Sequence, residues 1–200
     1  MSHSTASGIG SYHHGNLRSA LLAQARVLLD EDGPAALSLR EIARRAGVSA
    51  PSVYHHFASL DAMSVALAEE GFTELVARLE AAPMNAEGQL GEVGLAYVRF
   101  AMDNPGLYRL MFGEGLKTSS AESQAVRKLR ERAYECVKTG LRARLPEEEV
   151  ATGALYLWSL VHGLALLIID DRLGTYADPE KVIRPVLRLA GHGLPALTAY

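Results

Sequence analysis

The sequence predicts an all-α protein of about nine helices, with a small N-terminal three-helix part and a larger C-terminal helical part. Apolar residues recur at three- and four-residue spacing along nearly the whole chain, as in helices that bury one face. Serine, asparagine, proline and glycine fall where these patterns begin and end, in positions that helix termini favour. No alternating strand pattern, repeat or low-complexity tract competes with this interpretation.

The N-terminal part is predicted as a flexible arm over residues 1–15 and a three-helix unit over residues 16–58. The first helix is expected from Asn16 to about Asp32, and the Asp-Gly-Pro run at 32–34 ends it. Its apolar positions are Leu17, Ala20, Leu21, Ala25, Leu28 and Leu29.

Residues 38–57 are the most informative stretch, and they predict two short helices joined by a tight turn. Ser38 and Ser49 are placed to cap these helices, and Gly47 lies where the chain must leave the first one, a position that favours positive φ. Pro51 falls in the first turn of the second helix, where a missing N–H costs nothing. The core-facing positions are then Val48, Val53 and Phe57, and the outward ones are Pro51, Ser52, Tyr54, His55 and His56. A helix-turn-helix presents its second helix to the DNA major groove in this way.

The C-terminal part, residues 59–200, begins with a long helix that Ser59 caps and that reaches about Ala82. Loops are expected over 83–88 and 113–120. Between and after them we predict helices over 89–103, 104–112, 120–144, 147–171 and from Asp178 to Gly191 or Gly193. Asn104 is expected to cap the second of these, with Pro105 at its start. The helix over 147–171 is apolar nearly all round, so it must be covered on several sides.

Composition is typical of a soluble globular protein. The 200 residues are 48% hydrophobic, which is enough to form a substantial core. The start of the sequence lacks the basic and apolar segments of a secretory signal, and the apolar stretch 154–169 is shorter than the roughly 20 residues that span a bilayer. The one cysteine, Cys136, excludes an intramolecular disulfide and is expected to be buried and unreactive. We therefore expect a cytoplasmic protein without a membrane segment.

Four segments resemble the TetR family of bacterial transcriptional regulators. The N-terminal resemblance covers about the first 70 residues and is carried by 12–18 (YHHGNLR) and by the run from Ile42 through Gly47 to Phe57. Segments 104–112 (NPGLYRLMF) and 158–163 (WSLVHG) resemble, more patchily, the C-terminal domain named for its Trp-His-Gly motif. The resemblance implies a dimeric repressor, without a cofactor, that a small apolar or aromatic effector releases from a palindromic operator in double-stranded DNA.

Carried over by position, the resemblance places the start of the second motif helix near bases and Tyr54, His55 and His56 near phosphates. Arg40 matches a position used for guanine or phosphate, whereas for Arg44 and Arg45 a backbone contact and a solvated charge are equally good explanations. The predicted DNA-contacting residues are Ser38, Arg40, Arg44, Ser49, Ala50, Pro51, Ser52, Tyr54, His55 and His56.

Two features limit the expected DNA affinity. The family often has a lysine where this chain has Leu60, so a phosphate contact there must use backbone N–H groups at a helix start. The first 57 residues hold five arginines against four acidic residues, within a chain of net charge −3. Affinity must therefore come from a dimer with well-placed contacts rather than from bulk charge.

The C-terminal part is rich in aromatic residues, which predict an apolar effector cavity with few polar groups. Its expected effector-binding residues are Tyr97, Phe100, Met102, Tyr108, Met111, Phe112, Trp158, Val161 and His162. His162 shares a helix face with Trp158 and is the best polar contact, although a core histidine with satisfied hydrogen bonds is the favoured alternative. The resemblance also implies that the last two helices form a four-helix bundle with a second copy, and the helix over 104–112 is our candidate for the moving part.

Other classes of function fit less well. The acidic runs 147–149 and 170–171 have no partnering nucleophile or base, so we do not expect an enzyme. His55 and His56 diverge by about 100° on a helix and cannot chelate one ion, and the pair at 13–14 lacks further ligands, so no metal site is expected. A DNA-binding protein without an effector stays open as an alternative.

Overall fold

The structure, a computed structural model, describes residues 14–83, 89–113, 116, 124–174 and 178–193. Within these residues it consists of nine α-helices and one short 3-10 helix, with no strand. The elements are α1 (His14–Asp32), η1 (Pro34–Ala36), α2 (Leu39–Arg45), α3 (Ala50–His56), α4 (Leu60–Glu80), α5 (Gln89–Asp103), α6 (Pro105–Phe112), α8 (Gln124–Arg142), α9 (Glu147–Ile169) and α10 (Glu180–Gly193). The predicted all-α fold with an N-terminal helix-turn-helix and a C-terminal helical domain is confirmed.

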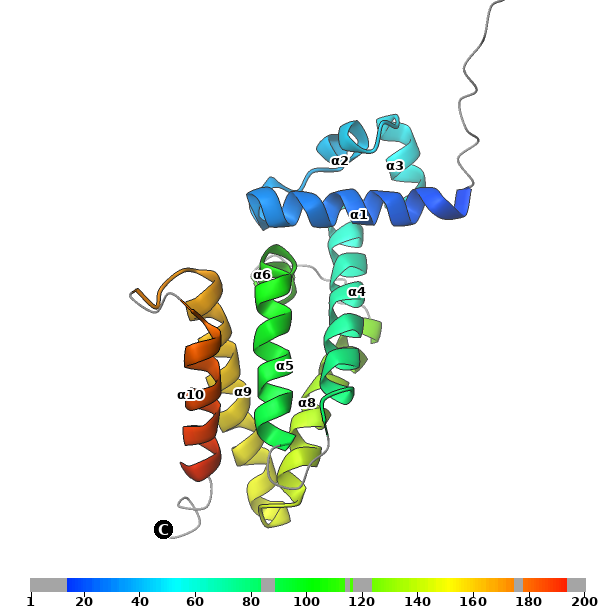
Figure 1. Cartoon of the computed structure of the whole chain (residues 1–200). Coiled ribbons are helices and arrows are strands. Elements are labelled where there is room, and N and C mark those ends of the chain that lie inside the picture. The colour runs from blue at the N-terminus through cyan, green and yellow to red at the C-terminus, as the bar shows by residue number, and fades with distance from the viewer. Residues whose placement is uncertain (1–13, 84–88, 114–115, 117–123, 175–177, 194–200) are drawn as a thin grey trace, which may run out of the picture.

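The N-terminal helices form one end of the molecule. Helix α1 lies across the top of the C-terminal helices, and α2 and α3 pack on its far side (Figure 1). The apolar face of α1 supplies Leu21, Leu22, Ala25, Leu28 and Leu29, all almost fully buried. Burial of such side chains stabilises by about 1.5–3 kcal/mol each, which is enough to hold two helices of seven residues that would not persist alone.

Helix α4 connects this unit to the rest of the chain. Ser59 caps it by accepting a hydrogen bond from the N–H of Ala62 at 3.1 Å, as the sequence predicted. Its buried face then packs along α8, α5 and α6. Helices α5, α9 and α10 run side by side on the other side of the bundle (Figure 1).

Most helix limits agree with the sequence. Helix α5 covers the predicted residues, whereas α1 begins at His14, two residues earlier than expected. Most of the predicted loops at 83–88 and 113–120, the start at Ser120, and the arm up to residue 13 lie outside the described residues.

Helix α9 is the most apolar element. Its length and mean hydropathy of 1.8 make it the one described helix that could cross a membrane, a test that core helices of globular proteins also pass. Here α9 packs against α5 and α8, and 33% of its most apolar window is buried. A large part of an apolar helix thus faces outward in the single chain.

Cys136 on α8 is half-buried, whereas a buried thiol was predicted. Burial raises the pKa of its thiol, so the reactive thiolate is scarce at neutral pH.

Candidate nucleic-acid interface and effector site

The turn between α2 and α3 has the geometry that its glycine predicted. Gly47 adopts a φ of +68°, and the N–H of Val48 donates to the carbonyl of Ala43 at 3.0 Å, closing the end of α2. Ser49 then caps α3, since its Oγ accepts from the N–H of Ser52 at 3.4 Å. The turn and the start of α3 thus have the local structure that Gly47 and Ser49 predicted.

One side of α3 packs against the core and against α1. Val53 is fully buried and Phe57 is 3% exposed, and the guanidinium of Arg18 on α1 lies 5.1 Å from the Phe57 ring centroid. The predicted inward positions of α3 are correct, and the opposite side of the helix is left facing outward.

The outward surface consists of residues from both motif helices. The exposed members are Arg40, Arg44, Ser49, Pro51, Tyr54 and His55, and the partly exposed members are Ser38, Ala50, Ser52 and His56. We call these ten residues the reading surface. Tyr54 is 58% exposed and is the large aromatic side chain of this surface. Ser38 holds the N-cap position of α2 without a side-chain capping hydrogen bond, so its predicted capping role is wrong.

Glu41 organises the arginines of α2. Arg44 bonds to both of its carboxylate oxygens, at 2.6 and 2.8 Å, and Arg45 bonds to it at 3.0 Å. Hydrogen bonds from Arg44 and then from Arg45 lower the pKa of Glu41 to about 2, so this carboxylate is ionised at neutral pH. Arg44 stays 71% exposed, whereas Arg45 also pairs with Glu31 at the end of α1 and is 22% exposed. Arg44 thus remains accessible, while Arg45 ties α2 to α1.

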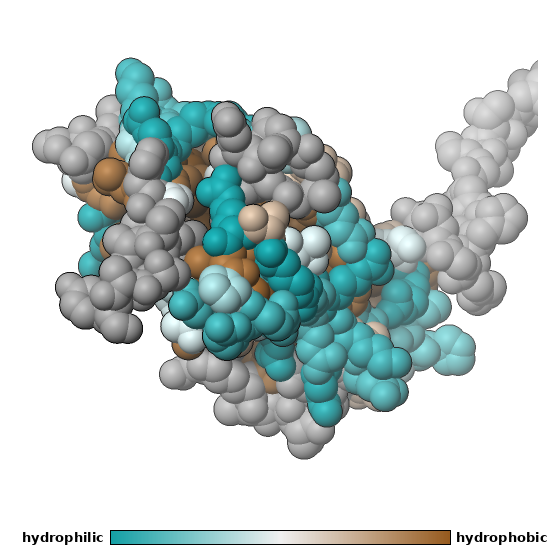
Figure 2. Space-filling model, turned by 90° about the horizontal axis from the view of Figure 1, so that it is seen from below, coloured by the Kyte–Doolittle hydropathy of each residue, from teal (hydrophilic) through white to brown (hydrophobic). Residues whose placement is uncertain are grey.

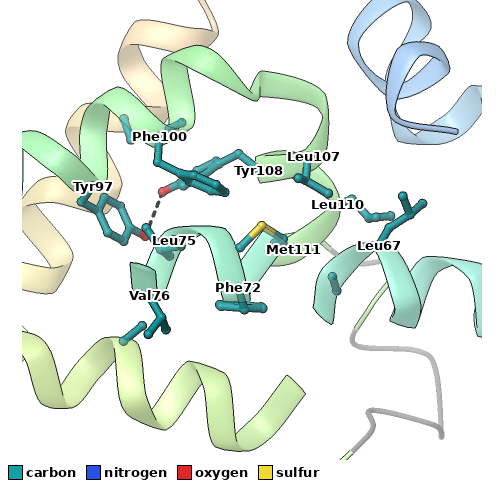
Figure 3. Packing of buried hydrophobic residues seen from close by; sticks show 14 of the residues in the cluster. Leu67, Phe72, Leu75, Val76, Tyr97, Phe100, Leu107, Tyr108, Leu110 and Met111 are labelled. Carbon is teal, nitrogen blue, oxygen red and sulfur yellow. Dashed lines mark hydrogen bonds between the residues drawn. The ribbon is translucent and has the colours of Figure 1, made fainter. Parts of the chain in front are cut away.

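A second cluster joins α5, α6 and α9. The hydroxyls of Tyr97 and Tyr108 lie 3.0 Å apart (Figure 3). The Nδ1 atom of His162 lies 3.1 Å from the first and 2.7 Å from the second. Burial raises the pKa values of both phenols and lowers that of the imidazole. All three groups are therefore neutral at pH 7.

Aromatic rings surround this cluster. The rings of Trp158 and Tyr97 lie 5.2 Å apart between centroids, and Phe112 lies 5.0 Å from His162. Trp158, Phe112 and His162 are partly exposed, whereas Tyr97 and Tyr108 are buried. The predicted effector residues that the structure brings together are Tyr97, Tyr108, Phe112, Trp158 and His162.

The other predicted effector residues lie elsewhere. Phe100 and Met111 are buried beside α4 (Figure 3). Arg78 of α4 lies over the Phe100 ring, and the Met111 sulfur packs at Gly71. Val161 is 5% exposed in the core. Met102 lies about 140° around α5 from Tyr97, on a different side of that helix.

A polar link between α1 and the C-terminal helices was not predicted from the sequence. Arg26 on α1 donates to the Oδ1 atom of Asn104 at 2.7 Å and to Glu74 on α4 at 3.0 Å. Asn104 is 8% exposed and also donates to the carbonyl of Phe100 at 3.1 Å. Asn104 was predicted to cap α6 with its side chain, but that side chain links three helices instead. The sequence could not reveal this link, because Arg26 and Asn104 are 78 residues apart.

The start of α6 also lies directly against the end of α1. The N–H of Gly106 donates to Asp30 at 3.2 Å, and a Cβ atom at Gly106 would lie 2.1 Å from the carbonyl oxygen of Leu29. Only glycine permits this approach. Helix α6 therefore connects the cluster around Tyr108 with the base of the helix-turn-helix unit.

Substitution of Gly106 tests this contact. We expect Gly106→Ala to lower the free energy of unfolding by about 1–3 kcal/mol, because the new methyl group overlaps backbone atoms that cannot move aside. Gly91→Ala is the matched control: nothing lies within 4 Å of its Cβ position in α5, so the usual helix preference for alanine should stabilise by up to about 1 kcal/mol. Urea unfolding measures both. If the urea midpoint of Gly106→Ala equalled or exceeded that of the unmodified protein, α1 and α6 would not meet this closely.

No group of three metal-ligating side chains occurs in the part of the chain that the structure describes. The structure instead has an exposed helix surface on α2 and α3 at one end of the molecule and a neutral polar-aromatic cluster among α5, α6 and α9. Together they define a helix-turn-helix transcription regulator with a separate C-terminal domain.

Comparison with known proteins identifies the family. Residues 21–74 match the family described as "Bacterial regulatory proteins, tetR family", and residues 90–190 match the "Tetracyclin repressor-like, C-terminal domain". The chain belongs to the TetR family, whose members are transcription regulators rather than enzymes.

Relatives agree with this assignment. The HTH-type transcriptional regulator YobS of Bacillus subtilis is 28% identical over 165 residues, which cover 78% of this chain and 81% of YobS. A solved protein of unknown function from Rhodococcus sp. RHA1 is 32% identical with a TM-score of 0.77, covering 92% of this chain and 97% of that one. A TetR variant from Acinetobacter baumannii AYE, solved in complex with minocycline, shares the fold at 20% identity and a TM-score of 0.64, covering 91% and 98% of the two chains.

Proposed function

We propose that this regulator is a cytoplasmic homodimeric repressor that binds a palindromic operator and is released by a small apolar or aromatic effector. In this proposal the residues before α1 form a flexible arm, the helices up to residue 58 bind DNA, and residues 59–200 form an effector-binding and dimerisation domain of the Trp-His-Gly type. The observation that carries it is the reading surface, whose outward face contains an exposed tyrosine, two histidines and two accessible arginines.

The reading surface is suited to DNA in its position and chemistry. Helices α2 and α3 form the extreme end of the molecule, away from the C-terminal helices (Figure 1). Arg40 makes no ion pair with any described residue, so its guanidinium is available for a guanine or a phosphate. Hydroxyl and imidazole groups of Tyr54, His55 and His56 can donate to phosphate oxygens. Leu60 supplies no charge, so a phosphate at the start of α4 would meet backbone N–H groups there.

An outward apolar stripe supports dimerisation through α9 and α10. Leu155 is 61% exposed, Tyr156 40% and Leu167 46%, and helical spacing places them on one side of α9. On α10, Leu189 is 72% exposed. The end of the C-terminal helices that lies away from α1 is, by contrast, largely hydrophilic, with small separate apolar areas (Figure 2). A stripe of this kind is costly in water, so a second copy is its natural cover.

A glycine within the stripe strengthens this interpretation. Gly163 has nothing within 4 Å of its Cβ position, so a helix of the second copy can approach α9 closely there. A two-fold dimer then separates the two α3 helices by a fixed distance, as a palindromic site with half-sites about 10 base pairs apart requires.

The aromatic cluster supports effector control. Trp158, Phe112 and His162 are only partly buried and present an apolar surface with one imidazole. The relative solved with minocycline binds a small molecule on the same fold. An effector bound at this cluster would contact α6, which packs on α1 at Gly106. An effector that prefers one arrangement of α6 would shift the spacing of the two reading surfaces. DNA affinity would then fall by the ratio of the effector's affinities for the two arrangements.

The proposal is tested by retardation of a DNA fragment from upstream of the protein's own gene, with and without hydrophobic small molecules. We expect a salt-sensitive complex that dissociates with those compounds that also raise the melting temperature. A complex that no stabilising compound dissociates would support the alternative of a regulator without an effector. Failure to retard the fragment at low ionic strength would contradict the proposal.

Substitution of Glu41 probes the role of Arg44. Glu41→Gln removes the carboxylate that engages Arg44 and should raise DNA affinity about two- to fivefold, because the guanidinium is released toward phosphate. Glu31→Gln is the matched control, since it removes a nearby charge that pairs with Arg45 instead. Fluorescence anisotropy over a range of salt concentrations measures both. Equal effects of the two substitutions would show that Arg44 does not contact DNA.

A further inference from the structure

The hydroxyls of Tyr97 and Tyr108 and the Nδ1 atom of His162 form a closed group of three polar atoms, which we call the polar triad. Every pair of these atoms lies within hydrogen-bond distance, at 2.7 to 3.1 Å. Tyr97 is 1% exposed and Tyr108 is fully buried, so bulk water does not reach their hydroxyls. Among the described residues, the side-chain hydrogen bonds of the two phenols are made within the triad.

Counting protons determines the state of the imidazole. The two phenols bring two O–H protons, and each proton needs an acceptor. If Tyr108 donates to Tyr97, then Tyr97 must donate to Nδ1; if Tyr97 donates to Tyr108, then Tyr108 must donate to Nδ1. Either arrangement requires a lone pair on Nδ1. A proton on Nδ1 would leave one buried phenol without an acceptor, which costs about 1–3 kcal/mol.

The neutral imidazole must then carry its proton on Nε2. His162 is half-buried, and no described residue accepts a hydrogen bond from Nε2. The imidazole lies 5.0 Å from the Phe112 ring between centroids, Phe112 in turn lies 6.3 Å from Trp158, and all three side chains are partly exposed. The triad thus converts a residue that could either donate or accept into a fixed donor.

We propose that the site recognises a ligand with an apolar body and a neutral hydrogen-bond acceptor, such as a ketone, ester or amide carbonyl, that accepts from Nε2–H of His162. This inference rests on the proposed effector function and specifies its ligand class. The aromatic rings contact the body of the ligand and Nε2–H orients its carbonyl. No charged side chain bonds to the triad among the described residues, so a buried carboxylate would lack a counter-charge, and a neutral acceptor is preferred.

The tautomer is tested first, on the unmodified protein. Long-range proton–nitrogen correlation spectra at neutral pH distinguish a protonated Nε2 from a protonated Nδ1. We expect His162 to be in the Nε2–H form, and Tyr97→Phe with Tyr108→Phe to yield a mixture of the two forms. A protonated Nδ1 in the unmodified protein would overturn the inference.

Ligand class is tested with three probes of similar size: acetophenone, ethylbenzene and benzoate. Trp158 is the only tryptophan, so its one indole N–H signal reports binding beside the triad. Acetophenone should bind about five- to tenfold more tightly than ethylbenzene, the value of one net hydrogen bond, and more tightly than benzoate. His162→Phe should abolish the preference for acetophenone, and His162→Gln, whose amide retains an N–H donor, should restore part of it.

The outcomes distinguish failure of the inferred ligand class from failure of the proposed regulator function. Equal binding of acetophenone and ethylbenzene, tightest binding of benzoate, or no binding of any probe overturns the inferred ligand class. DNA retardation by the same protein sample is measured in parallel. Its failure overturns the proposed regulator, whereas intact retardation with no preference among the probes overturns only the ligand class.

Discussion

Replacing Arg40 and Tyr54 together with alanine is expected to weaken operator binding by at least about thirtyfold while leaving the fold intact. Both side chains are exposed and neither supports the core, so no cavity or unpaired buried group results. A base contact by arginine contributes about 1–3 kcal/mol, and a dimer loses it in both half-sites. Fluorescence anisotropy with a labelled operator gives the affinity, and circular dichroism during heating gives the stability.

Two further variants serve as controls for the loss of operator affinity. Arg127→Ala removes one exposed positive charge from α8, far along the chain from the reading surface, and should leave binding within about twofold. Tyr54→Phe removes only the hydroxyl and separates its phosphate contact from ring packing. If the double substitution bound the operator as well as the unmodified protein, α3 would not be the DNA-contacting helix.

The second large effect is expected from Leu155→Glu, which should convert the proposed dimer to a folded monomer and lower apparent operator affinity by at least about a hundredfold. Leu155 is 61% exposed in one protomer, so the single chain loses little on substitution. In a dimer through α9 the new carboxylates would be buried without partners, at about 3–5 kcal/mol each. Sedimentation velocity measures the association state.

Val27→Glu is the matched control for this effect. Val27 on α1 is also an exposed large hydrophobic residue, at 44%, but it lies outside the α9 stripe. It should leave the sedimentation coefficient unchanged. A dimer that persisted in Leu155→Glu would place the interface elsewhere on the molecule.

Local features of the fold could be predicted from the sequence because their causes are local. The positive φ of Gly47, the caps at Ser49 and Ser59, and the buried positions Val53 and Phe57 depend on residues within a few positions of one another. Short-range periodicity and capping preferences contain this information.

Contacts between distant residues could not be predicted in the same way. Both Ser38 and Asn104 were assigned side-chain caps on pattern alone, yet Asn104 bonds to Arg26 across the domain junction. Spacing placed Trp158 and His162 on one face of a helix, but only tertiary packing brings Tyr97 and Tyr108 to the imidazole. The prediction of Met102 as an effector residue could have been avoided from the sequence. Five residues carry the chain one full turn and about 140° further, so Met102 and Tyr97 lie on different sides of α5.

The central claim is that the exposed side of α3 lies against DNA bases, and hydroxyl-radical footprinting tests it most directly. With the full-length protein at low ionic strength, on the fragment upstream of its own gene, we expect two protected patches about one helical turn apart on one face of the duplex. The patches should disappear when Arg40 and Tyr54 are replaced. Absence of protection, or protection that persists in that variant, would contradict the account.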